Sequence, residues 1–147
     1  MKKKKNILFI CKYNRFRSRV AEAYFNKINK NKLINVKSAG IIKGFLPLDK
    51  AQVRTAKSYG IFIKGKPKSV SSKMLSETDE IIIVANDVPK GIFKFKNRYI
   101  QKIHVWKVPD VLRGNDILGD KKIIEIIMKK VEGLIKELKK LKRTNPR

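Results

Sequence analysis

Continuous apolar runs along the chain alternate with segments in which apolar residues recur every three or four positions. Four segments are predicted as strands, and two of them, 6–11 and 80–85, are nearly continuous apolar runs, which is typical of strands buried on both faces of a parallel sheet. The four segments occupy residues 6–11, 33–38, 80–85 and 103–108. The helical period, together with helix start and stop signals, predicts helices at residues 20–28, 49–59, 71–77 and 121–143.

Strands that alternate with helices predict βαβ units and a parallel sheet covered by helices on both faces. The expected fold class is therefore α/β, a three-layer α/β/α arrangement with a four-stranded parallel sheet. The chain has neither an internal repeat nor a linker rich in proline, glycine or serine. We therefore expect a single domain over residues 1–147, with basic tails at about 1–5 and 139–147. Ligands bind such sheets at the carboxyl ends of the strands, so the loop after the first strand is the first candidate site.

The charge of the chain is strongly unbalanced, with 37 basic and 12 acidic residues and a formal net charge of +25. Such a charge attracts nucleic acid, anionic surfaces and phosphorylated or acidic proteins, and it says nothing about the fold. The abundance of lysine, asparagine and isoleucine also fits the codon usage of an AT-rich genome. The sequence leaves both interpretations of the charge open.

The sequence lacks signals for export, membrane insertion or metal binding. The apolar stretch at residues 7–11 is too short for the core of a signal peptide, and no run approaches the roughly 20 apolar residues that span a bilayer. We therefore expect a cytoplasmic protein without a transmembrane segment. Cys11 is the single cysteine and His104 the single histidine, so no internal disulfide can form, and neither a metal site nor a cofactor is expected.

The loop from Cys11 to Ser18, with the sequence CKYNRFRS, contains the residues best suited to chemistry. A loop of this length between a buried strand and a helix can turn its backbone N–H groups inward and bind an anion, and the helix adds its positive end. Arg17 can hold two phosphate oxygens at once. The positive surroundings favour the thiolate of Cys11, which could attack phosphorus and form a phosphocysteine. The alternative is a buried cysteine beside a surface arginine.

Residues 7–25, ILFICKYNRFRSRVAEAYF, resemble the opening of the low-molecular-weight protein tyrosine phosphatases, a hydrophobic strand followed by C-x-x-N-x-x-R-S and a helix that begins near A-E-A. The family resemblance continues at residues 38–40 (SAG) and 79–85 (DEIIIVA). It implies the Rossmann-like fold of that family, with Cys11 as the nucleophile and Arg17 as the phosphate-binding residue. Ser38 is implied as a supporting residue. The implied substrate-binding residues are Lys12, Tyr13, Asn14, Arg15, Phe16 and Ser18, of which Asn14 shapes the loop and Ser18 supports the thiolate.

Breaking the bond between phosphorus and the leaving oxygen requires a proton donor. The family supplies this proton from an aspartate in an Asp-Pro loop after the fourth strand. Asp110 matches that position and Asp116 is the second candidate, although the proline of this chain, Pro109, precedes Asp110 instead of following it. Alternatively, Asp110 only caps a turn.

Several positions depart from the family pattern. Leucine and arginine stand at 112–113, where the family has a tyrosine pair, and Arg15 replaces a residue that is usually aliphatic or threonine. With Lys12, Arg17 and Arg19, Arg15 is expected to make the rim of the pocket cationic. Such a rim favours substrates with extra negative charge beside the phosphate and disfavours phosphoarginine.

The sequence therefore predicts a phosphomonoester hydrolase, and specifically a protein tyrosine phosphatase that acts on phosphorylated proteins or other phosphomonoesters. One alternative is a non-catalytic module that binds phosphate or nucleic acid through its charge. Another is an arsenate reductase. That enzyme would need an external thiol, because Cys11 has no second cysteine to form a disulfide relay.

Overall fold

The computed structural model describes residues 4–44, 46–93, 102–110 and 116–144. Its centre is a sheet of four parallel strands in the order β2-β1-β3-β4. The strands are β1 (Lys5–Cys11), β2 (Ile34–Gly40), β3 (Glu80–Val84) and β4 (Lys102–Trp106). The helices are α1 (Arg17–Ile28), α2 (Lys50–Ser58), α3 (Ser72–Ser76) and α4 (Ile117–Thr144), with a short 3₁₀ helix η1 (Lys90–Phe93).

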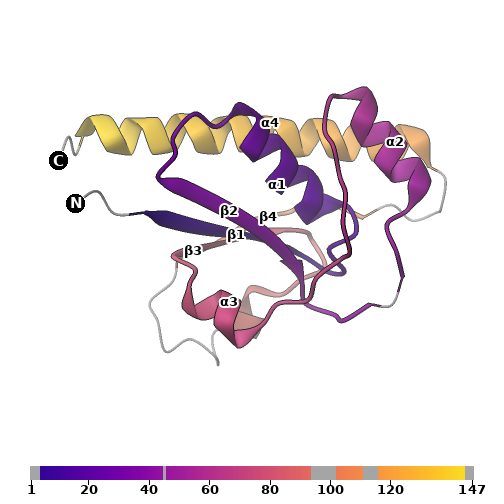
Figure 1. The fold of residues 1–147 in the computed structure, drawn as a ribbon, viewed down its shortest axis with the longest axis horizontal. Coiled ribbons are helices and arrows are strands. Elements are labelled where there is room, and N and C mark those ends of the chain that lie inside the picture. Colours follow the sequence, from indigo (N-terminus) through magenta and orange to yellow (C-terminus); the bar gives the residue numbers. More distant parts are fainter. Residues whose placement is uncertain (1–3, 45, 94–101, 111–115, 145–147) are drawn as a thin grey trace.

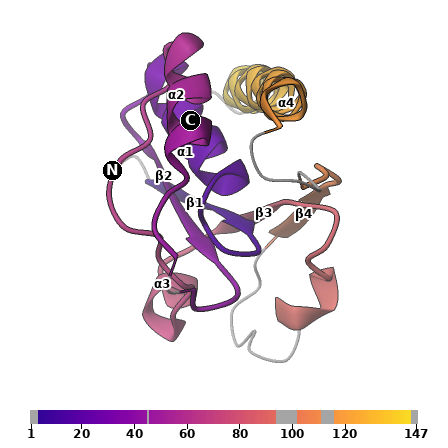
Figure 2. The same ribbon diagram turned by 90° about the vertical axis from the view of Figure 1, so that its right-hand side faces the viewer.

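Helices cover both faces of the sheet, but unequally (Figure 1 and Figure 2). The helices α1, α2 and α4 lie on one face, whereas the short α3 and η1 lie on the other. This arrangement confirms the predicted α/β class, its three layers and its four parallel strands. All four strands point the same way, so their carboxyl ends meet at the edge that Figure 2 faces.

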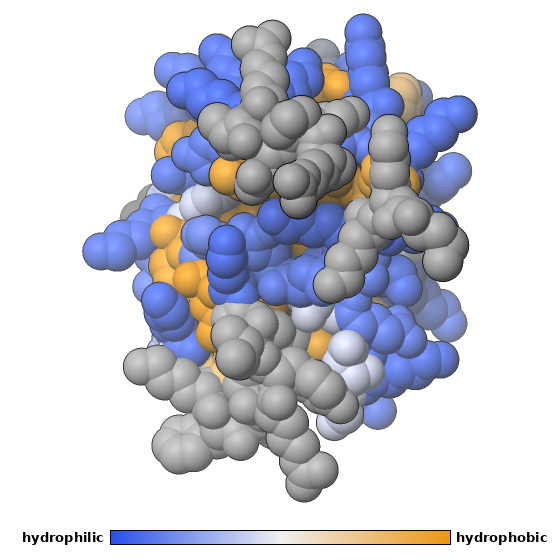
Figure 3. Space-filling model, turned by 90° about the vertical axis from the view of Figure 1, so that its left-hand side faces the viewer, coloured by the Kyte–Doolittle hydropathy of each residue, from blue (hydrophilic) through white to orange (hydrophobic). Residues whose placement is uncertain are grey.

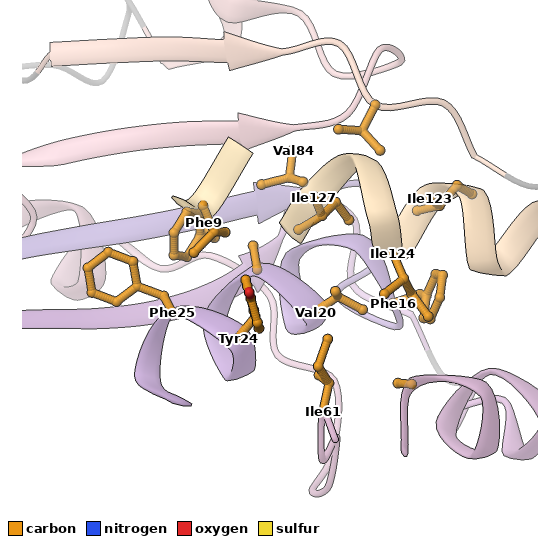
Figure 4. Packing of buried hydrophobic residues seen from close by; sticks show 14 of the residues in the cluster. Phe9, Phe16, Val20, Tyr24, Phe25, Ile61, Val84, Ile123, Ile124 and Ile127 are labelled. Carbon is orange, nitrogen blue, oxygen red and sulfur yellow. The ribbon is translucent and has the colours of Figure 1, made fainter. Parts of the chain in front are cut away.

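Two apolar clusters hold the layers together, because alternate residues of a strand face opposite sides of the sheet. Ile7 and Phe9 of β1 face α1 and α4, whereas Leu8 and Ile10 face α3. Figure 4 shows the larger cluster, in which Phe9 lies beside aromatic and aliphatic side chains of both long helices. The members of this cluster that are less than 1% exposed are Phe9, Val20, Ala21, Phe25, Ala56, Val84, Val108, Ile124, Ile127 and Val131.

Capping residues visible in the sequence set several helix boundaries. The Oδ1 atom of Asp49 accepts hydrogen bonds from the backbone N–H groups of Ala51 and Gln52, which starts α2. Gly60, just beyond the end of α2, has a φ of +73°, a conformation that favours glycine. Ser71 caps α3 in the same way as Asp49 caps α2. The predicted helices at 49–59 and 71–77 are therefore confirmed with small shifts at their ends.

Four boundaries near the carboxyl edge differ from the prediction. Helix α1 begins at Arg17 and not at residue 20, and strand β2 ends at Gly40 and not at residue 38. Strand β4 ends at Trp106 and not at Val108, because the N–H group of Val108 turns back to the carbonyl of Trp106 at 2.6 Å. Helix α4 begins at Ile117 and not at residue 121, because Asp116 caps it. Helix α4 also continues to Thr144, so residues 139–144 of the expected basic tail are helical.

The end of the molecule opposite the carboxyl ends of the strands is mainly hydrophilic, with apolar patches between the polar side chains (Figure 3). The beginning of β1 and the C-terminal end of α4 lie toward this side (Figure 1). Among the residues described, no helix has the length and apolar character needed to cross a membrane.

Glu80 is a buried acid at the beginning of β3, between two basic side chains of the neighbouring strands. Its Oε2 atom lies 2.7 Å from Nζ of Lys5, and its Oε1 atom lies 2.7 Å from Nε2 of His104. Burial alone raises the pKa of Glu80, but the hydrogen bonds and charges of Lys5 and His104 outweigh it and hold the pKa below its ordinary value. The single histidine therefore has a structural partner.

We expect Glu80→Gln to lower the free energy of unfolding at neutral pH by roughly 1–2 kcal/mol, because the charged hydrogen bonds are lost. A depressed carboxyl pKa stabilises the fold above the unfolded-state pKa, and this contribution disappears as the pH falls through the folded-state pKa. Urea unfolding of both proteins from neutral to acidic pH measures the effect, with the exposed Glu137→Gln as control. A difference that stays constant as the pH falls would contradict this assignment.

Candidate active site

The loop at residues 11–18 connects the carboxyl end of β1 to the first turn of α1. Asn14 adopts a left-handed conformation with a φ of +57°, which asparagine tolerates better than most residues. The loop packs closely on Gly40 at the end of β2, where an added Cβ would lie 2.6 Å from the carbonyl carbon of Tyr13. The end of β2, Ser38-Ala39-Gly40, therefore packs directly against the loop. At position 40 only glycine fits, because any side chain would collide with the loop backbone.

A chain of hydrogen bonds runs from this supporting segment to the thiol. The amide nitrogen of Asn14 donates to Oγ of Ser18 at 2.8 Å and to Oγ of Ser38 at 3.0 Å. Oγ of Ser18 lies 3.0 Å from Sγ of Cys11. Oγ of Ser38 donates to Oε1 of Glu22 at 2.6 Å. All of the bridging atoms lie in the interior, where an unpaired polar group would be costly.

The direction of this chain is fixed at both ends. The backbone N–H group of Lys68 can only donate, and it donates to Oδ1 of Asn14 at 2.9 Å. The amide nitrogen of Asn14 must therefore point at the two serines, whose oxygens accept from it. The Ser18 proton is then free to point at the Cys11 sulfur, which lies 3.0 Å from Oγ of Ser18.

Arg17 is buried beneath the mouth of the loop, with a side chain only 3% exposed. One of its terminal nitrogens, Nη1, donates to the carbonyl of Val108 at 3.0 Å. The other, Nη2, lies 3.0 Å from Oδ1 of Asp87 and 3.7 Å from Oδ2 of Asp110. The guanidinium group is thus held by segments that follow β3 and β4.

The remaining predicted loop residues divide into two groups. Tyr13 is exposed at the mouth, with Nζ of Lys12 at 5.4 Å from its ring centroid. Nε of Arg15 donates to the carbonyl of Pro47 at 2.9 Å. Phe16, in contrast, is 4% exposed and its side chain packs in the core (Figure 4). The side chain of Phe16 therefore does not face a ligand, and only its backbone remains for substrate binding.

The expected cationic rim is smaller than the sequence suggested. Arg17 and Arg19 are both buried, so Lys12 and Arg15 are the two of the four predicted cations that lie at the mouth. Sequence reasoning could not separate these two pairs, because all four are basic residues of one short segment. Positions 112–113, where the family has tyrosines, lie outside the described residues.

The two candidate acids have different environments. Asp110 is 45% exposed at the mouth and close to Arg17. Asp116 caps α4, and its Oδ1 atom accepts from the N–H group of Gly119 at 2.9 Å. Asp120, one turn further along α4, is buried and accepts a hydrogen bond from Gln52. Burial raises the pKa of Asp120, and the nearby carboxylates of Asp49, Asp116 and Asp110 add to this effect.

Sequence reasoning did not identify Asp87 or Asp120. Asp87 follows the carboxyl end of a buried strand, which is the position where functional residues of parallel sheets gather, so its place offered a usable signal. Asp120 gave no such signal, because an acid in the first turn of a helix is commonplace. Within the described ranges, no group of three or more metal-ligating side chains converges on one point.

Residues 6–144 match the sequence profile of a family described as low molecular weight phosphotyrosine protein phosphatase. Among solved structures, a low molecular weight protein tyrosine phosphatase from T. tengcongensis is 26% identical, with a TM-score of 0.78 over 90% of this chain and 99% of that chain. An arsenate reductase from Archaeoglobus fulgidus is 25% identical, with a TM-score of 0.69 over 88% and 98% of the two chains. The YwlE arginine phosphatase from Geobacillus stearothermophilus, 18% identical with a TM-score of 0.79 over 95% and 96%, shares the fold. A comparison with curated protein sequences gives no match.

We expect Asp87→Asn to strengthen the binding of inorganic phosphate or vanadate by about threefold or more, because a carboxylate that competes for Arg17 is removed. Titration of the folded protein with either anion measures the dissociation constant. The variant Glu137→Gln removes the same charge from the C-terminal half of α4 and should leave the constant unchanged. Weaker anion binding by Asp87→Asn would mean that Asp87 is needed to orient Arg17.

Proposed function

The chain belongs to the low molecular weight phosphotyrosine protein phosphatase family, and from this premise we propose that it hydrolyses phosphomonoesters through a phosphocysteine formed on Cys11. The observation that carries the proposal is the hydrogen-bond chain that ends at the Cys11 sulfur. A buried cysteine that served packing alone would not need a hydroxyl oxygen 3.0 Å from its sulfur. The neighbouring guanidinium group of Arg17 supplies the charge that an anionic substrate needs.

In the first step, the thiolate of Cys11 attacks phosphorus from the side opposite the leaving oxygen. A sulfur–phosphorus bond forms while the bond between phosphorus and the leaving oxygen breaks. Arg17 and the inward-facing backbone N–H groups of the loop bind the phosphoryl oxygens. Asp110 gives its proton to the leaving oxygen, which departs as an alcohol.

In the second step, water attacks the phosphorus of the phosphocysteine and passes a proton to Asp110. The sulfur–phosphorus bond breaks, inorganic phosphate leaves and the thiolate returns. Ser18 stabilises that thiolate as leaving group through the hydrogen bond that favours it in the resting enzyme. The position of Asp110 supports this role over Asp116, whose carboxylate is occupied in capping α4.

We further propose that the substrate is phosphotyrosine in proteins. Tyr13 is exposed at the mouth, where its ring can pack against the phenyl ring of a substrate. Arg15 belongs to the loop, and its Nε donates to the carbonyl of Pro47, so a phosphoarginine substrate would place a second guanidinium group near a like charge. Arsenate reduction would need a second thiol close to Cys11. The side chain described within hydrogen-bond distance of its sulfur is that of a serine, so this contact does not favour arsenate reduction.

The proposal predicts that the wild-type protein hydrolyses p-nitrophenyl phosphate and phosphotyrosine peptides, and that Cys11→Ser lowers both rates by about a thousandfold or more. The variant should still bind vanadate, because the loop and Arg17 are unchanged. A phosphoarginine peptide serves as the comparison substrate and should react more slowly. A folded wild-type protein without hydrolysis, but with salt-dependent RNA binding, would instead favour the non-catalytic binding module.

Asp110→Asn should slow the hydrolysis of an alkyl or unactivated aryl phosphate by about 100-fold, because the leaving oxygen then departs without a proton. The rate with p-nitrophenyl phosphate should fall much less, since p-nitrophenolate leaves readily on its own. Asp116→Asn provides the matched comparison in steady-state assays with both substrates. Equal slowing of good and poor leaving groups by Asp110→Asn would remove Asp110 from the role of acid.

A further inference from the structure

Arg19 occupies an unusual position for a cation. It lies in the first turn of α1, where the positive end of the helix dipole disfavours another positive charge. Its side chain is also buried, with only 7% of the residue exposed, and burial lowers the pKa of Arg19. Because both the helix dipole and burial disfavour the charge of Arg19, other contacts must stabilise it.

The compensating contacts are three backbone carbonyl groups. Nε of Arg19 donates to the carbonyl of Asn14 at 3.1 Å. Its terminal nitrogens donate to the carbonyls of Lys64 at 3.0 Å and Gly65 at 2.9 Å. The planar guanidinium group therefore joins the phosphate-binding loop to the segment that follows α2. A lysine has a single ammonium group and could not reproduce this fork.

The bond to Asn14 has a geometric consequence for the loop. A trans peptide group is planar, so its C=O and N–H bonds point in opposite directions. By holding the Asn14 carbonyl on the outer side, Arg19 turns the N–H group of Arg15 toward the other side of the loop. That is the orientation in which a backbone N–H can face a bound anion. Asn14 has a left-handed φ, so its peptide has few other supports from regular secondary structure.

The charge of Arg19 also acts on the nucleophile. Interactions with Glu22 and with the Cys11 thiolate raise the pKa of Arg19 and partly offset the lowering by burial. The attraction is mutual, so the Arg19 cation attracts a negative charge on Cys11. Two cations of α1, Arg17 and Arg19, belong to the surroundings of the thiol. Three acids complete these surroundings: Glu22 accepts a hydrogen bond from Ser38, and Asp87 and Asp110 lie close to Arg17.

We propose that Arg19 is a positioning residue for catalysis, which holds the Asn14 peptide so that the loop faces the phosphate and attracts negative charge on Cys11. This inference rests on the proposed phosphatase function. It assigns Arg19 a role different from that of Arg17, because Arg19 donates to backbone carbonyls of the loop and its neighbour and reaches the substrate only through them.

The test compares Arg19→Gln and Arg19→Lys with the wild-type protein and with Arg54→Gln, which removes the same charge from an exposed position of α2. We expect both Arg19 variants to lower kcat for p-nitrophenyl phosphate by about 100-fold with little change in KM, because the misplaced loop harms the transition state most. Arg19→Gln should also slow the alkylation of Cys11 by iodoacetamide at mildly acidic pH, by about tenfold. Arg19→Lys, which keeps the charge, should alkylate at close to the wild-type rate.

Near-ultraviolet circular dichroism and thermal unfolding check that each variant is folded. If Arg19→Gln fails to fold, Arg19→Lys alone decides the outcome through kcat. A folded Arg19→Gln whose kcat and alkylation rate match those of Arg54→Gln would overturn the proposal, as would a loss of thermal stability without a change in either rate. If neither variant folds, Arg19 is required for the fold and not for positioning, and the proposal is also overturned.

The alkylation rate separates this inference from the proposed function. A wild-type protein that does not hydrolyse phosphomonoesters would refute the phosphatase, but its thiol would still react with iodoacetamide. Slower alkylation in Arg19→Gln would then still support the effect of Arg19 on Cys11. Equal alkylation in an active enzyme, together with unchanged kcat, would refute the role of Arg19 and leave the phosphatase intact.

Discussion

The orientation of one side-chain amide, that of Asn14, determines much of the site. Its oxygen accepts a hydrogen bond from the backbone N–H group of Lys68, and its nitrogen donates to two serines. If the amide were rotated by 180°, its NH₂ group would face the N–H group of Lys68, and two donors would meet without an acceptor. From this single choice it follows that the Ser18 oxygen accepts from Asn14, which leaves the Ser18 proton available to Cys11. The same residue supplies the left-handed turn of the loop and the carbonyl that Arg19 holds. The thiol therefore depends on contacts that join β2, α1 and the segment after α2.

The acidic residues of the chain are unevenly distributed around the site. Although the chain has only 12 acidic residues against 37 basic ones, several of the acids gather at the carboxyl edge of the sheet. Those described above are Glu22, Asp49, Asp87, Asp110, Asp116 and Asp120. Buried arginines at the loop thus have local counter-charges. The attraction of a phosphate group therefore rests on local geometry at the loop more than on the large net charge of the whole chain.

Much of the fold could be predicted from the sequence, because buried parallel strands and capped helices leave local patterns. The run before Cys11 predicted β1, and Asp49 and Ser71 marked the starts of their helices. The parts that could not be predicted depend on contacts between distant segments. Phe16 was assigned to the ligand, yet its side chain packs in the core, and Arg19 was placed at the rim, yet it is buried. In both cases, the direction of a side chain in an irregular loop is decided by the elements packed around it and not by its neighbours in sequence.

The partners of the loop are widely separated along the chain. Asn14 is held by the backbone of Lys68, 54 residues away, and Arg17 by the carbonyl of Val108, 91 residues away. Contacts of such long range form late when a chain folds, since the intervening segments must be ordered first. During synthesis, the anion site therefore cannot be complete until the segment after β4 has left the ribosome, although the nucleophile was among the first residues made. Activity at this site thus requires the completion of almost the whole fold.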